Sequence, residues 1–294
     1  MMDSKTFKNI IIRKVFFIFF ILSYLIFSIY FYYFDEVDFY VTLTSWKGRI
    51  NYIHTNLEIL LNNSLKPKKI ILNLSIEEFP KKNLELPVEL INLEKKYNNF
   101  EIFWVNKNNN VFKKLIPTLN RYKDSLIITV DDDIIYPKNL FKKMFKCFRK
   151  EGGNNPMSFG QYYSDWNING TIIHSHYGAG SIVSYKYFNN KIDEIYKYTT
   201  KDRLNKGIKC PDDALYTYAS LLNGFLYKRC ERYKIKLNLY NPNNISFSES
   251  NSQRIMILNE QYHNIIQNYI KNKYNITVEQ LITKSLKTLN IKNK

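Results

Sequence analysis

Residues 127–136 read Ile-Ile-Thr-Val-Asp-Asp-Asp-Ile-Ile-Tyr, and this stretch is the most informative part of the chain. Four β-prone residues lead into three consecutive acids, and two isoleucines and a tyrosine follow them. Ionised carboxylates crowded in this way repel one another and resist transfer out of water. The arrangement becomes favourable where a divalent cation and a phosphorylated ligand neutralise the acids at the end of a sheet.

An alternation of strands and helices surrounds these acids. From short apolar, β-branched runs we expect strands at residues 39–43, 69–74, 101–105 and 126–130. Helical spacing is found at residues 52–61, 112–122, 137–150, 189–197 and 212–223. Strands separated by helices of this length predict right-handed βαβ units. We therefore expect an α/β fold with a mixed, mainly parallel sheet flanked by helices.

The composition limits the classes of partner and of stabilising site. The 294 residues carry a formal net charge of +17, which first suggests a nucleic-acid partner. No long Lys/Arg run is present, however, so we expect no nucleic acid. Compositional bias with a moderately basic surface is the simpler interpretation of the charge, and attraction to an anionic membrane, donor or acceptor is the functional one. The three cysteines, Cys147, Cys210 and Cys230, lack paired metal-ligand spacing, and we expect neither a zinc site nor a disulfide framework.

The amino end has the pattern of a membrane anchor. Residues 15–34 contain no charge and are long enough to cross a bilayer as one helix. Basic residues precede this segment and acids follow it, which places the amino terminus in the cytosol and the rest across the membrane. A cleaved signal peptide is the alternative, but no small-x-small cleavage site follows. We expect a single-pass, type II-like membrane protein, in the Golgi lumen if eukaryotic and in the inner membrane if bacterial.

These patterns divide the chain into a cytosolic tail, an anchor, a catalytic domain and a C-terminal helical tail. The four parts cover residues 1–14, 15–34, 35–250 and 251–294. The tail has apolar residues at helical spacing and a basic finish, which fits either packing on the body or a membrane-surface element.

Asp131 and Asp133 are the expected ligands of the cation. Two positions apart in extended chain, their side chains point to the same side and can share one ligand. Their hard oxygens suit Mn²⁺ or Mg²⁺ bridging a diphosphate. One alternative is a solvated acidic turn. Another is an aspartyl-phosphate phosphatase, with Asp131 as nucleophile and Asp133 as general acid, but Ile134-Ile135 stands where such enzymes have a small hydroxyl pair.

The chain resembles glycosyltransferases of the GT-A fold, in particular the large family 2 group. Four ordered blocks carry the resemblance, and together they extend from about residue 39 to 224. The blocks are residues 41–50, 60–80, 113–119 with 129–137, and 178–181 with 210–216. The resemblance implies a metal-dependent enzyme that moves a sugar from a nucleoside-diphosphate sugar to a glycan, lipid or protein acceptor.

The resemblance also implies roles for individual residues. Asp131 is expected to hold ribose or metal and Asp133 the metal, with Asp132 in support at the donor site. The other expected contacts to the nucleotide sugar are Thr44, Ser45, Arg49, Lys113, Lys114, Gly178 and Gly180. Among these, an ion pair at the surface is the simpler explanation for Arg49, and a solvated helix start for one of the two lysines.

Asp212 and Asp213 are the expected catalytic pair. Inverting members of the resembling fold use a carboxylate at a helix start to take a proton from the acceptor hydroxyl, which gives Asp213 as general base and Asp212 as its orienting neighbour. Favourable charges at a helix dipole explain the same pair without catalysis. His174 or His176 is a further candidate metal ligand or acceptor contact, although histidines near loops are more often structural.

A membrane-anchored basic module that holds polysaccharide or nucleic acid without catalysis is the competing function. Such a module does not need the acidic triplet, and acids at its centre weaken its affinity for polyanions.

Overall fold

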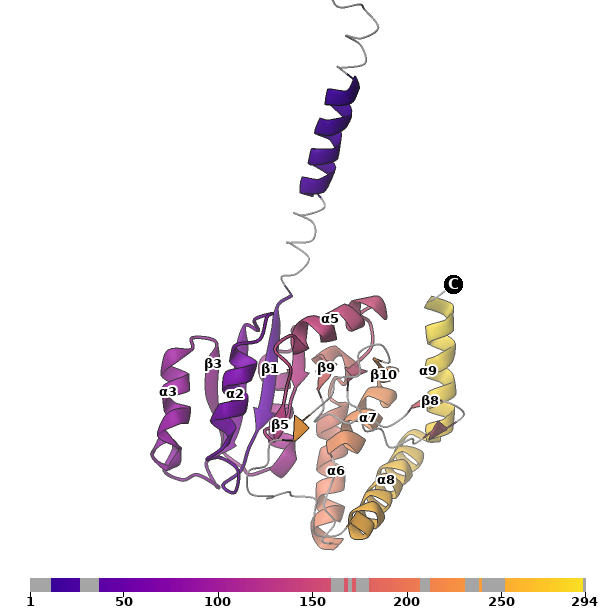
Figure 1. Cartoon of the computed structure of the whole chain (residues 1–294). Coiled ribbons are helices and arrows are strands. Elements are labelled where there is room, and N and C mark those ends of the chain that lie inside the picture. Colours follow the sequence, from indigo (N-terminus) through magenta and orange to yellow (C-terminus); the bar gives the residue numbers. More distant parts are fainter. Residues whose placement is uncertain are drawn as a thin grey trace, which may run out of the picture. The chain divides into compact units, whose positions relative to one another are not determined.

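The computed structural model describes residues 12–26, 37–159, 167–168, 171–172, 180–206, 212–230, 238–239 and 252–292. The chain divides into two compact units, Met1–Asp38 and Phe39–Lys294, and the second unit is the body of the protein (Figure 1).

In the first unit, residues 12–26 form a helix whose large apolar side chains are exposed. Among the described residues, no helix has both the length and the apolar character needed to cross a membrane. Residues 27–34 of the expected anchor lie outside the described residues, so the anchor stays a prediction.

The body is built on a sheet whose described strands follow the order β10-β6-β9-β4-β1-β2-β3. The strands are β1 (Phe39–Thr44), β2 (Lys69–Ser75), β3 (Phe100–Val105), β4 (Leu126–Thr129), β6 (Met157–Ser158), β9 (Ser181–Val183) and β10 (Lys228–Arg229). β1, β2, β3 and β4 are parallel to their neighbours within this group, and β9 runs antiparallel to both β4 and β6. The expected mixed, mainly parallel α/β sheet is therefore confirmed.

Two short strand pairs lie beside the main sheet. β5 (Ile134–Ile135) pairs antiparallel with β11 (Asn238–Leu239), and β7 (Asn167–Ile168) pairs with β8 (Thr171–Ile172). The first pair matters for the site because β5 begins directly after the acidic triplet.

Helices cover both faces of the sheet (Figure 1). They are α2 (Ile53–Leu61), α3 (Val88–Lys96), α4 (Ile116–Arg121), α5 (Leu140–Lys150), α6 (Lys191–Lys206), α7 (Asp212–Leu222), α8 (Ser252–Tyr274) and α9 (Val278–Lys292). Three 3₁₀ helices accompany them in the described part of the chain, at η1 (Lys82–Glu85), η2 (Asn110–Lys114) and η3 (Tyr185–Tyr187). Because strand side chains alternate between faces, Phe39 packs on α5 while Tyr40 packs against the core on the other side.

The last two helices belong to the core of the body. Tyr262, Ile266 and Ile270 of α8, together with Ile282 of α9, are buried in the cluster that also contains Leu215 of α7. The described part of the C-terminal segment therefore packs on the body through its apolar side.

The predicted helix at residues 112–122 is broken in the structure. η2 ends at Lys114, and α4 starts again at Ile116 with Pro117 in its first turn. Proline has no amide hydrogen and cannot continue a preceding helix, which accounts for the break.

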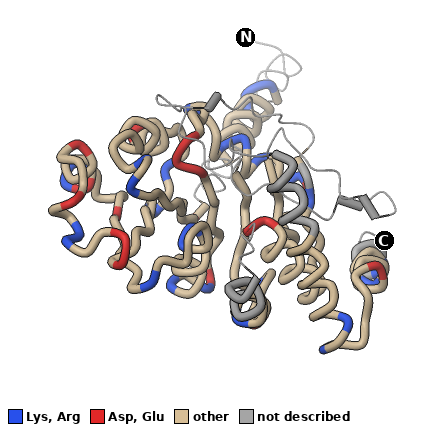
Figure 2. Tube along the Cα trace, turned by 90° about the horizontal axis from the view of Figure 1, so that it is seen from below, with Lys and Arg blue, Asp and Glu red and all other residues tan. Residues whose placement is uncertain are grey.

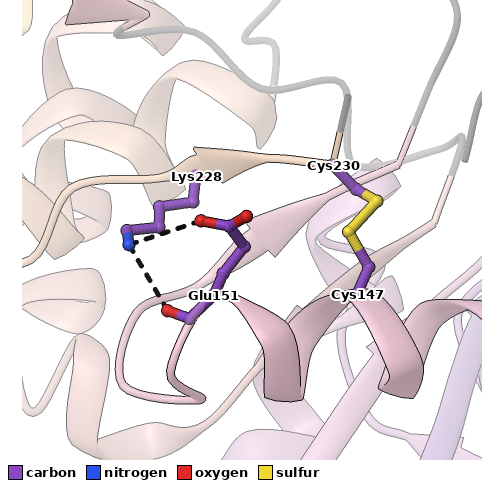
Figure 3. Close-up of a disulfide and its surroundings, with 4 residues drawn as sticks. All are labelled: Cys147, Glu151, Lys228 and Cys230. Atoms are coloured by element: carbon purple, nitrogen blue, oxygen red, sulfur yellow. Dashed lines mark hydrogen bonds and ion pairs between the residues drawn. A yellow bond between two sulfur atoms is a disulfide. The ribbon is translucent and has the colours of Figure 1, made fainter. Parts of the chain in front are cut away.

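A disulfide joins Cys147 of α5 to Cys230 next to β10, with their Cα atoms 6.1 Å apart (Figure 3). This bond corrects the expectation of no disulfide framework, since one pair of the three cysteines is bonded. The two residues are 83 positions apart and meet only because α5 packs near the β6–β10 strand pair, so their spacing carried no signal. The amide of Cys230 donates to the carbonyl of Ser158 at 3.0 Å, which ties it to β6. Cys210 lies outside the described residues.

Candidate active site

The candidate site lies where the strand order of the sheet reverses. From β1 the chain proceeds to β2 and β3 on one side, and then returns to place β4 on the other side of β1. In open α/β sheets, ligands bind in the crevice beyond the carboxyl ends of the strands at such a reversal. The segments that leave β1 and β4 at this point contain Ser45 and Arg49, and Asp131 to Asp133, respectively.

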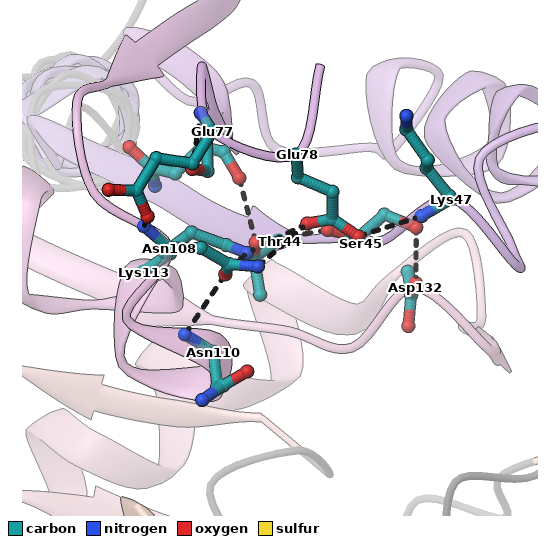
Figure 4. Close-up of polar contacts among 11 residues, drawn as sticks. Thr44, Ser45, Lys47, Glu77, Glu78, Asn108, Asn110, Lys113 and Asp132 are labelled. Carbon is teal, nitrogen blue, oxygen red and sulfur yellow. Dashed lines mark hydrogen bonds and ion pairs between the residues drawn. The ribbon is translucent and has the colours of Figure 1, made fainter. Parts of the chain in front are cut away.

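Asp132 points into the protein. Its carboxylate accepts a hydrogen bond from the Ser45 hydroxyl at 2.6 Å (Figure 4) and pairs with Arg49 at 3.0 Å. The Asn56 side chain donates to the backbone carbonyl of Asp132 at 2.6 Å. Burial raises the pKa of Asp132 to about 7, although Arg49 and Ser45 oppose this shift. Asp132 therefore anchors the acidic turn to the loop after β1.

Asp131 and Asp133 contact different cations. Lys114 Nζ lies 2.7 Å from Asp131 Oδ1, and Arg49 pairs with Asp133. The expectation of extended chain through the triplet was wrong, because β4 ends at Thr129 and residues 132–133 lie in a turn. Burial raises the pKa of Asp133, and the charge of Asp131 adds to this shift, so the two carboxylates still interact electrostatically.

Lys114 joins two acidic segments that are about eighty positions apart in the sequence. Its ammonium group pairs with Asp131 at the end of β4 and, at 3.3 Å, with Asp212 at the start of α7. Only 7% of Lys114 is exposed. Burial alone lowers the pKa of Lys114, but the charges of Asp131, Asp212 and Asp213 raise it well above its ordinary value. Lys114 is therefore a permanent cation inside the site.

A buried hydrogen-bond network fixes the backbone beneath Lys114. The Thr42 hydroxyl of β1 donates to the Lys114 carbonyl and lies 2.7 Å from the Thr118 hydroxyl of α4. Asn73 of β2 donates to the Thr42 hydroxyl at 2.9 Å and to the Thr118 hydroxyl at 3.1 Å. Two strands and a helix thus hold Lys114 in place, and the sequence patterns did not identify Asn73 or Thr118 as part of the site.

Lys113 points to a different polar cluster, although it is adjacent to Lys114. Residues next to each other in a 3₁₀ helix lie about 120° apart around its axis, which separates the two side chains. The ammonium group of Lys113 pairs with Glu78 at 3.2 Å and donates to Asn108 (Figure 4). Burial lowers the pKa of Lys113, and the charge of Glu78 opposes this shift.

The cluster around Lys113 lies beyond the carboxyl ends of β2 and β3. The Lys47 amide donates to Glu78 at 3.0 Å, and the Asn108 amide donates to Glu77 at 2.8 Å. Sequence reasoning did not select Glu77, Glu78 or Asn108, although their positions just after β2 and β3 are a signal that could have been used.

Thr44 uses its hydroxyl within the protein. This hydroxyl donates to the carbonyl of Asn73 at 2.7 Å, which joins β1 to β2.

Asp212 and Asp213 lie in the first turn of α7. Burial raises the pKa of Asp212, and the charge of Lys114 opposes this shift. The carbonyl of Asp213 accepts the Thr217 hydroxyl at 2.8 Å, as expected inside a helix. The structure thus brings the expected catalytic pair next to the expected metal site, with Lys114 between them.

Gly180 is the described part of the expected small-residue loop. Its φ of +105° lies in a region that L side chains rarely adopt, and a Cβ there would lie 3.4 Å from Met144 Cε. Gly178, His174 and His176 lie outside the described residues, so their expected roles stay predictions.

The acids of the site exceed the cations that pair with them. Among the described residues of the site, four carboxylates share two cationic side chains as their ion-pair partners. The carboxylates are Asp131, Asp132, Asp133 and Asp212, and the cations are Arg49 and Lys114. Hard oxygen donors with excess negative charge fit Mn²⁺ or Mg²⁺. Among the described residues, no group of three or more His, Cys, Asp or Glu side chains is arranged to hold a metal ion.

Sequence comparisons with known proteins find no match, either to a family model or to a curated protein. Among solved structures, the chain is similar to a 4-diphosphocytidyl-2C-methyl-D-erythritol synthase from Anaerococcus prevotii, with 14% identity, a TM-score of 0.41 and coverage of 77% of this chain and 96% of the other. It is also similar to S. aureus TarS 1–349 in complex with UDP-GlcNAc, with 12% identity, a TM-score of 0.43 and coverage of 82% and 74%. At these identities and TM-scores the similarities assign no function, which has to be inferred from the site residues.

Proposed function

We propose that the protein is a metal-dependent glycosyltransferase that uses a nucleoside-diphosphate sugar. The observation that carries this proposal is the ion-paired chain from Asp131 through Lys114 to Asp212 at the reversal point of the sheet. In support of the proposal, Lys114 lies between Asp131, a proposed cation ligand, and Asp212, the neighbour of the proposed general base Asp213. A glycosyltransferase needs this proximity because the acceptor hydroxyl attacks the same anomeric carbon that the donor diphosphate leaves.

Each acid has a separate task in the proposed reaction. Asp131 and Asp133 would hold Mn²⁺ or Mg²⁺, which would stabilise negative charge on the leaving nucleoside diphosphate. Asp213 takes the proton from the acceptor hydroxyl, and Asp212, held by Lys114, orients it. One in-line displacement at the anomeric carbon then inverts its configuration. The acceptor is a glycan, a lipid or a protein.

The polar groups behind these acids keep the turn in shape. Ser45, Arg49 and Asn56 hold Asp132, so that the two flanking carboxylates are fixed on a short turn. Preorganisation of this kind means that the acids need little reordering when charge develops.

We also propose that residues 15–34 anchor the protein in a membrane and that the body lies on the non-cytosolic side. The basic residues before the segment and the acids after it support this orientation. The Cys147–Cys230 disulfide supports it independently, because such bonds persist in oxidising compartments.

A donor-hydrolysis assay tests the proposed activity. The purified full chain is incubated with a panel of nucleoside-diphosphate sugars, and release of nucleoside diphosphate is measured with Mn²⁺, with Mg²⁺ and with a chelator. We expect metal-dependent release with at least one donor. Asp133→Ala and Asp213→Ala are expected to reduce it by about 100-fold or more.

Asp124→Ala is the matched control, since Asp124 is an exposed acid before β4, at the opposite end of that strand from the triplet. Release that is equal in the two site variants and the control would contradict the proposal. Polyanion binding without turnover of any donor would instead favour the anchored binding module.

A further inference from the structure

One face of α5 is an exposed stripe of basic side chains. Lys142, Lys146, Arg149 and Lys150 are exposed, and they recur at the spacing of one helix face. We call these four residues the basic stripe. The opposite side of α5 is buried in the body, and residues 140–150 contain no acid.

Repulsion within the basic stripe would destabilise α5 as an isolated helix. Lys142 and Lys146, and Lys146 and Lys150, are like charges four positions apart, which destabilise a helix. Within the described part of the chain, no acidic side chain pairs with these three lysines. Glu151, the next acid along the chain, pairs with Lys228 at 3.7 Å (Figure 3). An anionic partner from outside the chain would relieve this repulsion.

The end of the body opposite α5 does not show this segregation of charge. Viewed from the end of the body opposite α5, basic and acidic positions are mixed along the chain (Figure 2).

The position of α5 near the first residue of the body indicates which anion it meets. The Phe39 ring lies 5.4 Å from Phe141 and 4.8 Å from Phe145, both on the buried side of α5. Five peptide steps separate Phe34, the last residue of the proposed anchor, from Phe39, and five steps span at most about 18 Å. If residues 15–34 cross a membrane, the length of the chain keeps Phe39, which α5 contacts, within about 18 Å of the end of the anchor.

We propose that the basic stripe docks on anionic phospholipid headgroups of the membrane that holds the anchor. The inference rests on the proposed anchor but not on the proposed catalytic activity. Lysines near an anionic surface gain electrostatic energy within about a Debye length, roughly 10 Å at moderate salt. Docking of this kind fixes the orientation of the body, and thus of its active site, relative to the membrane.

Lysine footprinting on the full chain tests the proposal. The protein is reconstituted into nanodiscs of phosphatidylcholine alone or mixed with phosphatidylglycerol, and acylation by an N-hydroxysuccinimide ester is followed by mass spectrometry. In the anionic discs we expect Lys142, Lys146 and Lys150 to react about fivefold more slowly, which corresponds to about 1 kcal/mol per cation. High salt is expected to remove the difference.

Internal and matched controls separate docking from a general effect of the lipid. The exposed lysines Lys81, Lys82 and Lys271 are expected to react equally in both kinds of disc. Lys138 is exposed just before α5 and is also expected to be protected in the anionic discs. In the variant Lys142→Glu/Lys146→Glu/Lys150→Glu, this protection of Lys138 is expected to be lost. The variant Lys81→Glu/Lys82→Glu/Lys271→Glu is expected to retain the protection of Lys138.

The possible failures are distinguishable. Equal reactivity of the stripe in the two discs would overturn the docking while leaving the anchor and the enzyme standing. A chain that associates with neither disc would remove the anchor and overturn the inference with it. Protection by a soluble acidic glycan but not by anionic discs would also overturn it.

Discussion

Replacement of Lys114 by methionine tests the centre of the proposed site. The substitution keeps an unbranched side chain but removes the ammonium group that lies 2.7 Å from Asp131 and 3.3 Å from Asp212. The buried carboxylate of Asp212 and the half-buried carboxylate of Asp131 are then left without their cation. Removal of one partner from a buried ion pair costs about 3–5 kcal/mol, because the other charge is left uncompensated. We expect Lys114→Met to lower the free energy of unfolding by an amount in this range.

Urea unfolding followed by circular dichroism measures this change. Lys113→Met is the matched control, because Lys113 is also buried and pairs with one acid, Glu78, away from the acidic turn. Both variants are expected to be destabilised. The proposed function distinguishes them, because it assigns a cation to Asp131, where Mn²⁺ would replace the lost positive charge, and none to Glu78. Added Mn²⁺ is therefore expected to raise the unfolding midpoint of Lys114→Met more than that of the wild type, and that of Lys113→Met no more than the wild type.

Two results would refute this reasoning. An unfolding midpoint of Lys114→Met equal to that of the wild type would mean that Lys114 does not neutralise buried acids. An equal response of all three proteins to Mn²⁺ would mean that the acids Lys114 contacts do not bind the cation.

Three further predictions follow from the geometry outside the acidic turn. Cys147→Ser opens a loop of 83 residues and is expected to cost about 2–4 kcal/mol; reductant should lower the thermal midpoint of the wild type but not of this variant, and equal effects would contradict the prediction. Gly180→Ala forces a side chain into φ +105° and is expected to lower the unfolding free energy by about 1–3 kcal/mol, whereas an unchanged urea midpoint would show that the loop adapts. Burial by itself raises the pKa of Glu194. Hydrogen bonds from Lys273, Tyr274, Tyr269 and Lys191 outweigh this effect and lower the pKa from 4.5 to about 2. The stabilisation by Glu194 is therefore complete above pH 4.5 and lost as the pH falls towards 2. Glu194→Gln is expected to cost about 1–2 kcal/mol at pH 6 and almost nothing near pH 2, as measured by urea titration at each pH, and a pH-independent difference would argue against the ionised contact.

Local patterns in the sequence were sufficient for the architecture. Alternating strand and helix periodicities predicted the mainly parallel α/β sheet, because each periodicity reflects which side of a single element is buried. The same periodicity correctly predicted that residues 131–133 follow the end of a strand, because the apolar run that forms β4 stops just before them. These properties depend on residues close together in the chain, and a single sequence expresses them directly.

Contacts between distant segments were decided only by the tertiary structure. The sequence did not show that Lys114 pairs with Asp131 and Asp212 while Lys113 pairs elsewhere, since this depends on the 3₁₀ turn that carries both lysines. It gave no sign that Cys147 meets Cys230. Such pairings arise from the packing of whole helices and strands, and that packing brings residues together without any regular spacing between them in the chain.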